Sequence, residues 1–468
     1  MIPGLIGVAV SLLLGYFITS LLWPSGVSST PAVLFSPAIG IGLCSIIYVV
    51  FRRPIFVVEA GLLLILAVSW FVLRRPATPS PLWARSSDLP GVYILLACGL
   101  GMALSYWMIR VDRSPYGDGD AVAIWTSHAR YLYRDGAFWQ KTILNTFHAD
   151  YPLLTSATTA RLWRYMGQEM PDAAGMLGVL YALTTLGILT GSLAYFRGPS
   201  RAALFGLTLL GTPFYLDYAT SQSADVPLSL YVLVTIALIC FQANETPEKR
   251  GLLVLSGFAA GCAGWTKNEG LLFIAATLVA LLTPAFWKTR DTLRRLSAFL
   301  AGIALPLAMI LWFKFAVAPP NDLFGGRHYA EVIQKVSNPQ RYVTVLFGLS
   351  DNFWSFGDWM LNPILLLVAY VALRRLDRRM LLNTGWIQGV FICATVLIGY
   401  GTVYLITPQD VQAHIDSSLP RLYLHLWPAF LLLAGLIAAE NKTGNDLLES
   451  HQPDRAARRT RAPVAAEK

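Results

Sequence analysis

The chain has 468 residues, of which 55% are hydrophobic and 13% are charged, and its formal net charge is +9. Soluble domains carry about 25% charged residues, so this composition excludes an ordinary soluble protein, which needs a solvated surface. Apolar runs of about 17–25 residues recur along the chain, and that length crosses the hydrocarbon core of a bilayer. The sequence therefore predicts an all-α polytopic membrane protein.

The apolar runs predict thirteen transmembrane helices. The first run is too long for the apolar core of a signal peptide and lacks a small-residue cleavage site, so it counts as a span. Two long hydrophilic loops are expected at 110–172 and 319–359, and a shorter one at 407–422. The helices are expected at about 2–23, 31–51, 55–73, 90–109, 173–195, 202–216, 226–242, 251–266, 270–287, 296–318, 360–373, 384–406 and 423–439.

Lys and Arg in the short connections orient these helices, because cytoplasmic connections are enriched in both residues. With thirteen spans, the connections rich in Lys and Arg lie on the same side of the membrane as the C-terminal tail. One of them contains Arg374, Arg375, Arg378 and Arg379. All three hydrophilic loops then lie on the external side. Arg52 and Arg53 are an exception, because the alternation of successive spans across the membrane, or parity, also places them outside. An error among the first three spans would explain them.

The positive charge of the turns and tail suits anionic lipid headgroups better than nucleic acid. The five cysteines all lie in apolar runs without a CxxC spacing. They are interpreted as packing residues, with neither a disulfide framework nor a metal site expected.

The first long loop opens with two carboxylates, Asp118 and Asp120, in a Gly-Asp-Gly-Asp run that predicts a turn. Apolar residues then recur every three to four positions over 121–134, which predicts an amphipathic helix on the membrane surface. Asp120 would stand at the start of this helix. It either caps the helix or serves as a functional carboxylate.

His148 and Asp150 come next and precede Pro152, so extended backbone is expected there. Asp150 could instead cap the following helix, with the proline in its first turn. Arg161 and Arg164 on that helix would meet either an anion or a lipid headgroup.

Two later positions place ionisable residues at the edges of spans. Asp225 begins one span and is explained either by helix capping or by function. Lys267 and Glu269 lie between two apolar runs with almost no room for a loop, and Gly270 indicates a tight turn. Such residues are costly at a membrane edge unless they are paired or functional, although snorkelling alone could explain Lys267.

The second long loop contains Arg327 and His328, followed by the aromatic residues Trp354, Phe356 and Trp359. These aromatics fit an interfacial belt better than a sugar-binding platform. Arg421 starts the last span from the external side, where it would contact a headgroup or a substrate. These positions are more informative together than singly. The expected topology places the acidic groups of the first loop, Lys267 and Arg421 at the same membrane depth on one face.

Several strings resemble the GT-C membrane glycosyltransferases, and most closely the bacterial group related to protein O-mannosyltransferases and to the lipid A aminoarabinose transferase. The resemblance covers about residues 90 to 440. Three spans precede the helix that usually comes first in this family. The strings are Asp120-Ala-Val-Ala-Ile-Trp125, His148-Ala-Asp-Tyr-Pro-Leu-Leu154, Ser223-Ala-Asp-Val-Pro-Leu228, Trp265-Thr-Lys-Asn-Glu-Gly270 and Arg421-Leu-Tyr-Leu-His-Leu-Trp-Pro428.

The resemblance implies a polyprenyl-phosphate sugar donor, an acceptor outside the cytoplasmic membrane, and inversion at the anomeric carbon. It makes Asp120 the catalytic base, with Asp118 as a substitute. The second motif of relatives often carries a lysine beside the donor phosphate. Here that stretch has His148 and Asp150, so Lys267 and Arg421 are expected to bind the phosphate. Further substrate-binding residues are expected to be His148, Asp150, Asp225, Glu269, Arg327 and His328.

The expected organisation is an N-terminal three-helix extension (1–89), a catalytic transmembrane module (90–318), an external loop with the C-terminal helices (319–439), and a disordered cytoplasmic tail (440–468). The protein would lie in the bacterial cytoplasmic membrane with an external active face. No cofactor is expected, although Asp118, Asp120 and Asp150 could ligate a divalent ion.

The expected partners are a polyprenyl-phosphate sugar, a glycan, lipid or protein acceptor, and membrane lipids. Nucleic acid is not expected. A transporter or flippase of a lipid-linked saccharide is the main alternative, but transporters place ionisable residues at mid-membrane, where these runs have almost none. A polysaccharide polymerase or ligase and a non-catalytic assembly factor are further alternatives.

Overall fold

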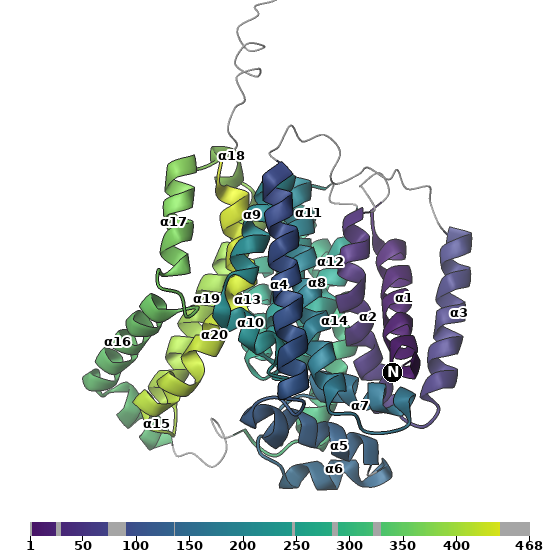
Figure 1. The fold of residues 1–468 in the computed structure, drawn as a ribbon. Helices are drawn as coiled ribbons and strands as arrows, with labels where there is room; N and C mark the ends of the chain where they lie inside the picture. Colours follow the sequence, from purple (N-terminus) through teal and green to yellow (C-terminus); the bar gives the residue numbers. More distant parts are fainter. Residues whose placement is uncertain are drawn as a thin grey trace, which may run out of the picture.

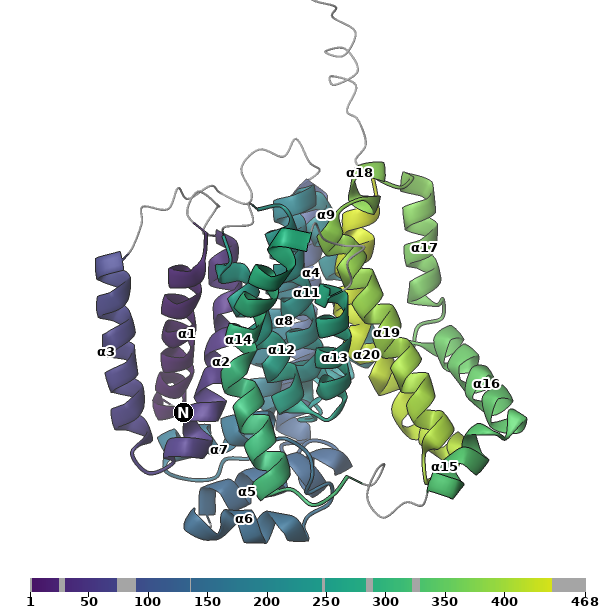
Figure 2. The same ribbon diagram turned by 180° about the vertical axis from the view of Figure 1, so that it is seen from behind.

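The computed structural model describes residues 2–24, 30–73, 90–134, 136–245, 249–282, 289–321 and 329–439. These residues are helical and include no β-strand, apart from an isolated antiparallel bridge between Leu376 and Ala438. Most of the long helices run side by side between two opposite faces of the molecule (Figures 1 and 2). Within the described residues, nine helices are long and apolar enough to cross a membrane, which confirms the all-α polytopic class.

The first four long helices are α1 (Ile2–Leu22), α2 (Thr30–Phe51), α3 (Ile55–Leu73) and α4 (Pro90–Arg113). The first three spans are therefore as predicted. Arg52, between α2 and α3, donates a hydrogen bond to the carbonyl of Gly136 in the first long loop and lies 5.4 Å from the ring centroid of Trp139. Arg52 thus lies on the same face as that loop, as parity requires, and no span needs to be removed.

The first long loop is a layer of short helices on one face, which is the lower face in Figure 1 and is called the loop face below. The predicted helix at 121–134 is divided into a π-helix followed by an α-helix. The elements are η1 (Ala121–Thr126), α5 (Ser127–Arg134), η2 (Gly136–Phe138), α6 (Trp139–Thr142), η3 (Ile143–Asn145) and α7 (Leu154–Met166).

The span predicted at 202–216 is interrupted. Thr212 has extended backbone (φ −86°, ψ 105°), and Pro213 opens a new helix, because a residue before proline avoids the helical region. The pair of helices is α9 (Pro199–Leu210) and α10 (Pro213–Thr220), after α8 (Asp172–Arg197).

The core of the bundle is α11 (Asp225–Ala243), which is buried over almost its whole length. Beside it lies α12 (Gly251–Thr266), which in turn packs against α13 (Glu269–Leu282) and α14 (Thr289–Ala316). A β-carbon on Gly257 of α12 would lie 2.0 Å from the carbonyl oxygen of Phe299 on α14. A glycine therefore lets these two helices approach backbone to backbone, as small residues do in membranes.

The C-terminal part contains α15 (Tyr329–Val336), α16 (Pro339–Ser355), α17 (Pro363–Arg374), α18 (Arg378–Leu381), α19 (Thr384–Ile406) and α20 (Val411–Ile437). The loop predicted at 407–422 is wrong, because most of it is the start of α20. Asp410 caps this helix by accepting a hydrogen bond from the Ala413 N–H at 3.0 Å. The first turns of α20 are polar, so hydropathy alone did not reveal them.

The aromatic residues predicted to form an interfacial belt differ in their burial. Phe356 is 3% exposed and packs on Trp427, so it belongs to the core and not to an interfacial belt. Trp354, by contrast, is 56% exposed. The predicted disordered tail at 440–468 lies outside the described residues.

Candidate active site

Asp225, the first residue of α11, binds side chains from α20 and from the turn between α12 and α13, near the loop face. Its side chain is fully buried. Oδ1 lies 3.0 Å from Nζ of Lys267 and 2.7 Å from Nε2 of His425, and Oδ2 accepts from Nε of Arg421 at 3.0 Å. Ala224 is the N-cap of α11, without a side-chain hydrogen bond. The capping interpretation of Asp225 is therefore wrong, and its carboxylate instead holds two cations and a histidine.

Arg421 connects this buried carboxylate to Asp120. Its Nη2 lies 2.9 Å from Oδ2 of Asp225, and its Nη1 donates to Oδ2 of Asp120. Asp120 makes no side-chain capping bond to the helix that follows it, so the capping interpretation fails here too. The Asp120 side chain is 47% exposed, whereas that of Arg421 is 18% exposed. One guanidinium thus bridges a buried carboxylate and an accessible one.

The backbone explains why the start of the first loop reaches this site. The N–H of Asp118 donates to the carbonyl of Ser221, just before α11, at 3.2 Å. Gly117 has φ +70°, and a β-carbon there would lie 2.5 Å from the same Ser221 oxygen. Only glycine allows this close approach, which brings the acidic turn beside the end of α11.

Lys267 and Glu269 lie in a tight turn between α12 and α13. Lys267 Nζ is 2.9 Å from Oε1 of Glu269, and both residues belong to the same cluster as Asp225. A β-carbon on Gly270 would lie 2.1 Å from the carbonyl of Ala263, which confirms the predicted tight turn. Lys267 is 4% exposed, so it does not snorkel to the surface.

His425 completes the group and was not among the predicted site residues. It lies four residues after Arg421, so the two side chains share one face of α20. Its Nδ1 is 3.3 Å from the hydroxyl of Tyr400. The i, i+4 spacing of an arginine and a histidine in an apolar helix was the available sequence signal. We call Asp120, Asp225, Lys267, Glu269, Arg421 and His425 the Asp225 cluster.

A second cluster forms around Asp150. Its Oδ2 accepts from the side-chain amides of Asn268 at 2.6 Å and Asn321 at 2.7 Å. Lys314 of α14 donates to the carbonyl of Asp150 and, at 2.6 Å, to Oδ1 of Asn268. The capping interpretation of Asp150 is therefore wrong, because Leu153 precedes α7 without a side-chain cap. Lys314 was also missed, because its charge lies inside a predicted span.

Since Asn268 lies between Lys267 and Glu269, the turn between α12 and α13 joins the two clusters. Asp118 stands apart and pairs with Arg110 at 3.8 Å. Burial raises the pKa of Asp118, as do the charges of Asp217 and Asp120, while Arg110 lowers it.

His148 is exposed and does not enter either cluster. Its backbone is left-handed (φ +48°), not extended as predicted, and its ring stacks on Tyr151 at 4.7 Å. Tyr151 stacks in turn on Trp125 at 5.6 Å. Arg327 and His328 lie outside the described residues.

Arg161 is neither at the surface nor in either cluster. Its Nε and Nη2 donate to the two carboxylate oxygens of Glu59 on α3, at 2.6 and 2.9 Å, and both residues are 1% exposed. Ser11 and Gly7 of α1 accept from the same guanidinium at 3.0 Å. This pair therefore fastens α1 and α3 to α7, and the anion that Arg161 meets is the carboxylate of Glu59.

No group of three or more His, Cys, Asp or Glu side chains in the described part of the chain is arranged to hold a metal ion. The three aspartates considered as ligands face different partners: Asp118 faces Arg110, Asp120 faces Arg421 and Asp150 faces two asparagines. They do not converge on one point.

An apolar groove of about 590 Å³ opens between α16, α19 and α20. One wall is a face of α16, and the other is formed by α19 and Tyr423 of α20. The hydroxyl of Tyr423 donates to the carbonyl of Leu349 at 2.9 Å and joins the two walls. Tyr423 belongs to α20, the helix that also carries Arg421, although side chains two residues apart point to different sides of a helix. The residues of the groove on α16 are Tyr342, Val345, Leu346, Leu349, Ser350 and Phe353.

No family model and no curated protein matches the chain. It is similar to the crystal structure of ArnT from Cupriavidus metallidurans in the apo state, at 17% identity and a TM-score of 0.49, over 77% of this chain and 63% of that one. It is also similar to ArnT from the same organism bound to undecaprenyl phosphate, at 16% identity and a TM-score of 0.43, over 78% and 63%. The match thus spans less than two thirds of either solved chain. At 17% and 16% identity, both likenesses concern the helical fold alone.

Proposed function

We propose that the chain is an inverting glycosyltransferase that moves a sugar from a polyprenyl-phosphate donor to an acceptor at the external face of the cytoplasmic membrane. The observation that carries this proposal is the bridge of Arg421 between buried Asp225 and half-exposed Asp120. It supplies an accessible carboxylate and a cation at one point, and both are held in place by a fully buried anion.

In this reaction, Asp120 takes the proton from the acceptor hydroxyl or amine, and the acceptor atom attacks the anomeric carbon. The bond from that carbon to the phosphate oxygen breaks, and polyprenyl phosphate leaves with the bonding electrons. A positioned base accounts for the deprotonation of the acceptor, and a fixed orientation accounts for its attack on the anomeric carbon. Arg421 and Lys267 would neutralise the departing phosphate in a site of low dielectric constant.

The apolar groove supports a lipid-linked donor. It is lined mainly by apolar side chains, which suit a hydrocarbon chain, and its wall includes Tyr423 of α20, the helix that also carries Arg421. Asp225, Glu269 and Asp150 would act by fixing these groups rather than by contacting the sugar. His148, stacked and exposed, would contact the substrate from the loop layer.

The proposal can be tested in cells that lack the gene and are complemented with wild-type or variant protein. Mass spectrometry of lipid extracts should show an accumulated polyprenyl-phosphate sugar in the deletion strain and with Asp120→Asn, but not with the wild type. Asp416→Asn is a matched control, because Asp416 is exposed on α20 and accepts a hydrogen bond from Gln412, one turn away in the same helix. Stable Asp120→Asn protein that restores the glycan would refute the catalytic role of Asp120.

A flippase would also cause a lipid-linked sugar to accumulate, so transfer must be measured with purified protein as well. Donor and acceptor mixed in detergent remove any need for transport across a bilayer. We expect wild-type protein to release polyprenyl phosphate there and Asp120→Asn to be at least about 10²-fold slower. Restoration of the glycan in cells without transfer in detergent would favour the flippase.

The external position of the loop face can be tested separately. Leu144→Cys places a thiol in the loop layer, where the native side chain is 47% exposed. Arg378→Cys places one on the opposite face, in α18 (Figure 1). A membrane-impermeant maleimide should label the first variant in intact cells and the second only after lysis. The reverse pattern would invert the proposed orientation.

A further inference from the structure

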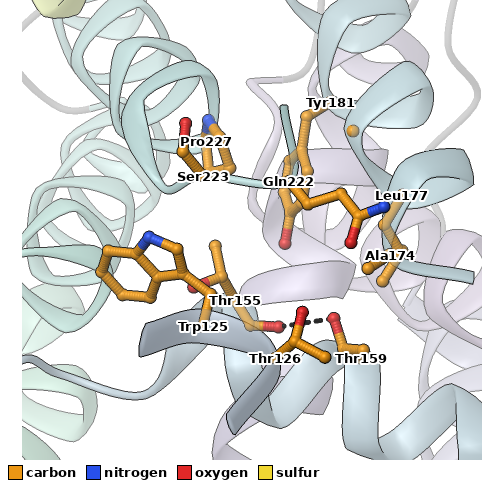
Figure 3. A pocket seen from close by; sticks show the side chains of 11 residues that line it. Trp125, Thr126, Thr155, Thr159, Ala174, Leu177, Tyr181, Gln222, Ser223 and Pro227 are labelled. Carbon is orange, nitrogen blue, oxygen red and sulfur yellow. Dashed lines mark hydrogen bonds between the residues drawn. The ribbon is translucent and has the colours of Figure 1, made fainter. Parts of the chain in front are cut away.

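A small cavity lies between η1, α7, α8 and the start of α11, beside the Asp225 cluster (Figure 3). Its volume is about 20 Å³, which is enough for one water-sized group but not for a sugar ring. None of the residues that line it is charged. The polar residues among them are Trp125, Thr126, Thr155, Thr159, Gln222 and Ser223, together with Tyr181.

Five polar atoms on this cavity have no hydrogen-bond partner within the described part of the chain. They are Nε1 of Trp125, Oγ1 of Thr126, Oγ1 of Thr155, the hydroxyl of Tyr181 and Oε1 of Gln222. Their residues are only 2%, 4%, 8%, 2% and 7% exposed, respectively. Burial of a polar group without a partner is destabilising, and a concentration of five such atoms around one void needs an explanation.

The backbone on two sides of the cavity is also unusual. Gln222 has φ +62°, a left-handed conformation that is unfavourable for a side chain of this kind. The amide nitrogen of its side chain donates to the carbonyl of Pro115 at 2.8 Å, which leaves the amide oxygen free to face the cavity. Trp125 and Thr126 lie in the π-helix η1. Such local irregularities concentrate at binding and functional sites.

The five atoms define what they can bind. The indole N–H of Trp125 only donates, the amide oxygen of Gln222 only accepts, and the threonine and tyrosine hydroxyls do both. A ligand must therefore donate and accept hydrogen bonds, and it must be neutral, because no charged side chain is present to compensate a buried charge. We infer that the cavity is a binding site for a single neutral hydroxyl group, supplied by a water molecule or by a hydroxyl of the substrate sugar.

Binding of a sugar hydroxyl rests on the proposed glycosyl transfer, whereas binding of a water molecule does not. In both cases the hydroxyl joins Trp125 to Gln222. Trp125 belongs to the helical segment that starts after Asp120, and Gln222 lies three residues before Asp225. A bound hydroxyl thus links the segment that carries the accessible carboxylate to the segment that carries the buried one.

Substitution of threonine by valine tests the inference through the sign of its effect. Thr126→Val and Thr155→Val keep the shape of the side chain and remove its hydroxyl. If the cavity is empty, each change removes an unpaired buried hydroxyl and should raise the apparent Tm. If a hydroxyl is bound, each change removes one of its partners. Thr159→Val is the matched control, because Thr159 lines the same cavity but its hydroxyl already donates to the carbonyl of Thr155 at 3.1 Å.

For bound water, we expect the apparent Tm of purified substrate-free protein to fall by about 1–3 °C in Thr126→Val and Thr155→Val, relative to Thr159→Val. Thr126→Ser, which retains the hydroxyl, should restore it. For a sugar hydroxyl, the substrate-free Tm should not fall, but KM for the donor or acceptor should rise by about 10-fold in both variants and not in the control.

An unchanged or raised Tm together with an unchanged KM would overturn the inference. Failure of the proposed function is distinguishable, because it would appear as a lack of transfer by the wild-type protein. The Tm comparison needs no transfer and would still decide whether the cavity binds water. If transfer is absent and the Tm does not fall, both the inference and the proposed function are wrong.

Discussion

The Glu59–Arg161 pair and the Asp225 cluster both bury charge near the loop face, but they differ in how completely the charges are matched. Glu59 and Arg161 form a one-to-one pair at 1% exposure, with Ser11 and Gly7 as further acceptors for the guanidinium. The Asp225 cluster has three carboxylates, two permanent cations and a histidine, and it reaches solvent through Asp120, which is 47% exposed.

This difference indicates that buried ion pairs have two roles in this protein. A closed pair has no bonding capacity left for a ligand, so it can only hold elements together, here the N-terminal helices and α7. An open cluster with surplus carboxylate can exchange a partner for a substrate. Removal of one member of a buried pair is costly, whereas replacement of both by apolar groups is often neutral. The two regions should therefore respond differently to paired substitutions.

The largest effect is expected in the closed pair. Arg161→Met leaves the Glu59 carboxylate buried without a partner and should lower the free energy of unfolding by about 3–5 kcal/mol. The double variant Glu59→Leu/Arg161→Met should recover most of this loss and retain transfer. Thermal unfolding and yield of folded protein in detergent measure both. A double variant as unstable as the single one would show that the charges themselves, and not their pairing, fasten the N-terminal helices.

In the open cluster, the corresponding change should reduce transfer and leave the fold largely intact. Arg421→Lys keeps the charge, but a lysine cannot reproduce the two directions in which the guanidinium binds Asp120 and Asp225. We expect kcat/KM for transfer to fall by about 10²–10³-fold. Arg110→Lys is the control, since Arg110 pairs only loosely with Asp118, at 3.8 Å. Retention of more than about a tenth of the activity in Arg421→Lys would argue against a geometric role for the guanidinium.

A smaller effect is expected at Lys314, which acts through the turn between α12 and α13. It binds the carbonyl of Asp150 and the side chain of Asn268, next to Lys267. Lys314→Met should shift this turn and lower kcat by about 10-fold, with a smaller change in KM, because positioning rather than substrate contact is lost. A change in KM alone would instead make Lys314 a direct ligand of the donor.

The sequence predicted the class of the protein and most of its helices, because hydropathy over about 20 residues is a strong signal in membranes. It failed where a helix is polar, as in the first turns of α20, and where a proline divides a span, as after Thr212. Both errors arise from the use of hydropathy as the only measure of helix formation.

Most residues of the site were predictable one by one, but their connections were not. Asp120, Asp225, Lys267, Glu269 and Arg421 were all identified, with capping as an alternative for both aspartates, whereas His425 and Lys314 were missed. Arg421 is 196 residues from Asp225 and 301 from Asp120, and no local pattern reports such a contact. The same holds for Glu59 and Arg161, which are 102 residues apart.

The smallest effect separates Asp118 from Asp120. Burial and the neighbouring negative charges of Asp217 and Asp120 raise the pKa of Asp118, so it gains its charge at a higher pH than an ordinary aspartate. Ionised Asp118 repels the negative charge that a nearby base must carry, and so opposes deprotonation of that base. Asp118→Asn removes this repulsion and should move the acidic limb of the transfer profile to lower pH by a fraction of a unit, with the maximal rate changed by less than about twofold. A loss as large as that of Asp120→Asn would instead make Asp118 the base, because a residue that only modulates the local charge cannot abolish proton abstraction.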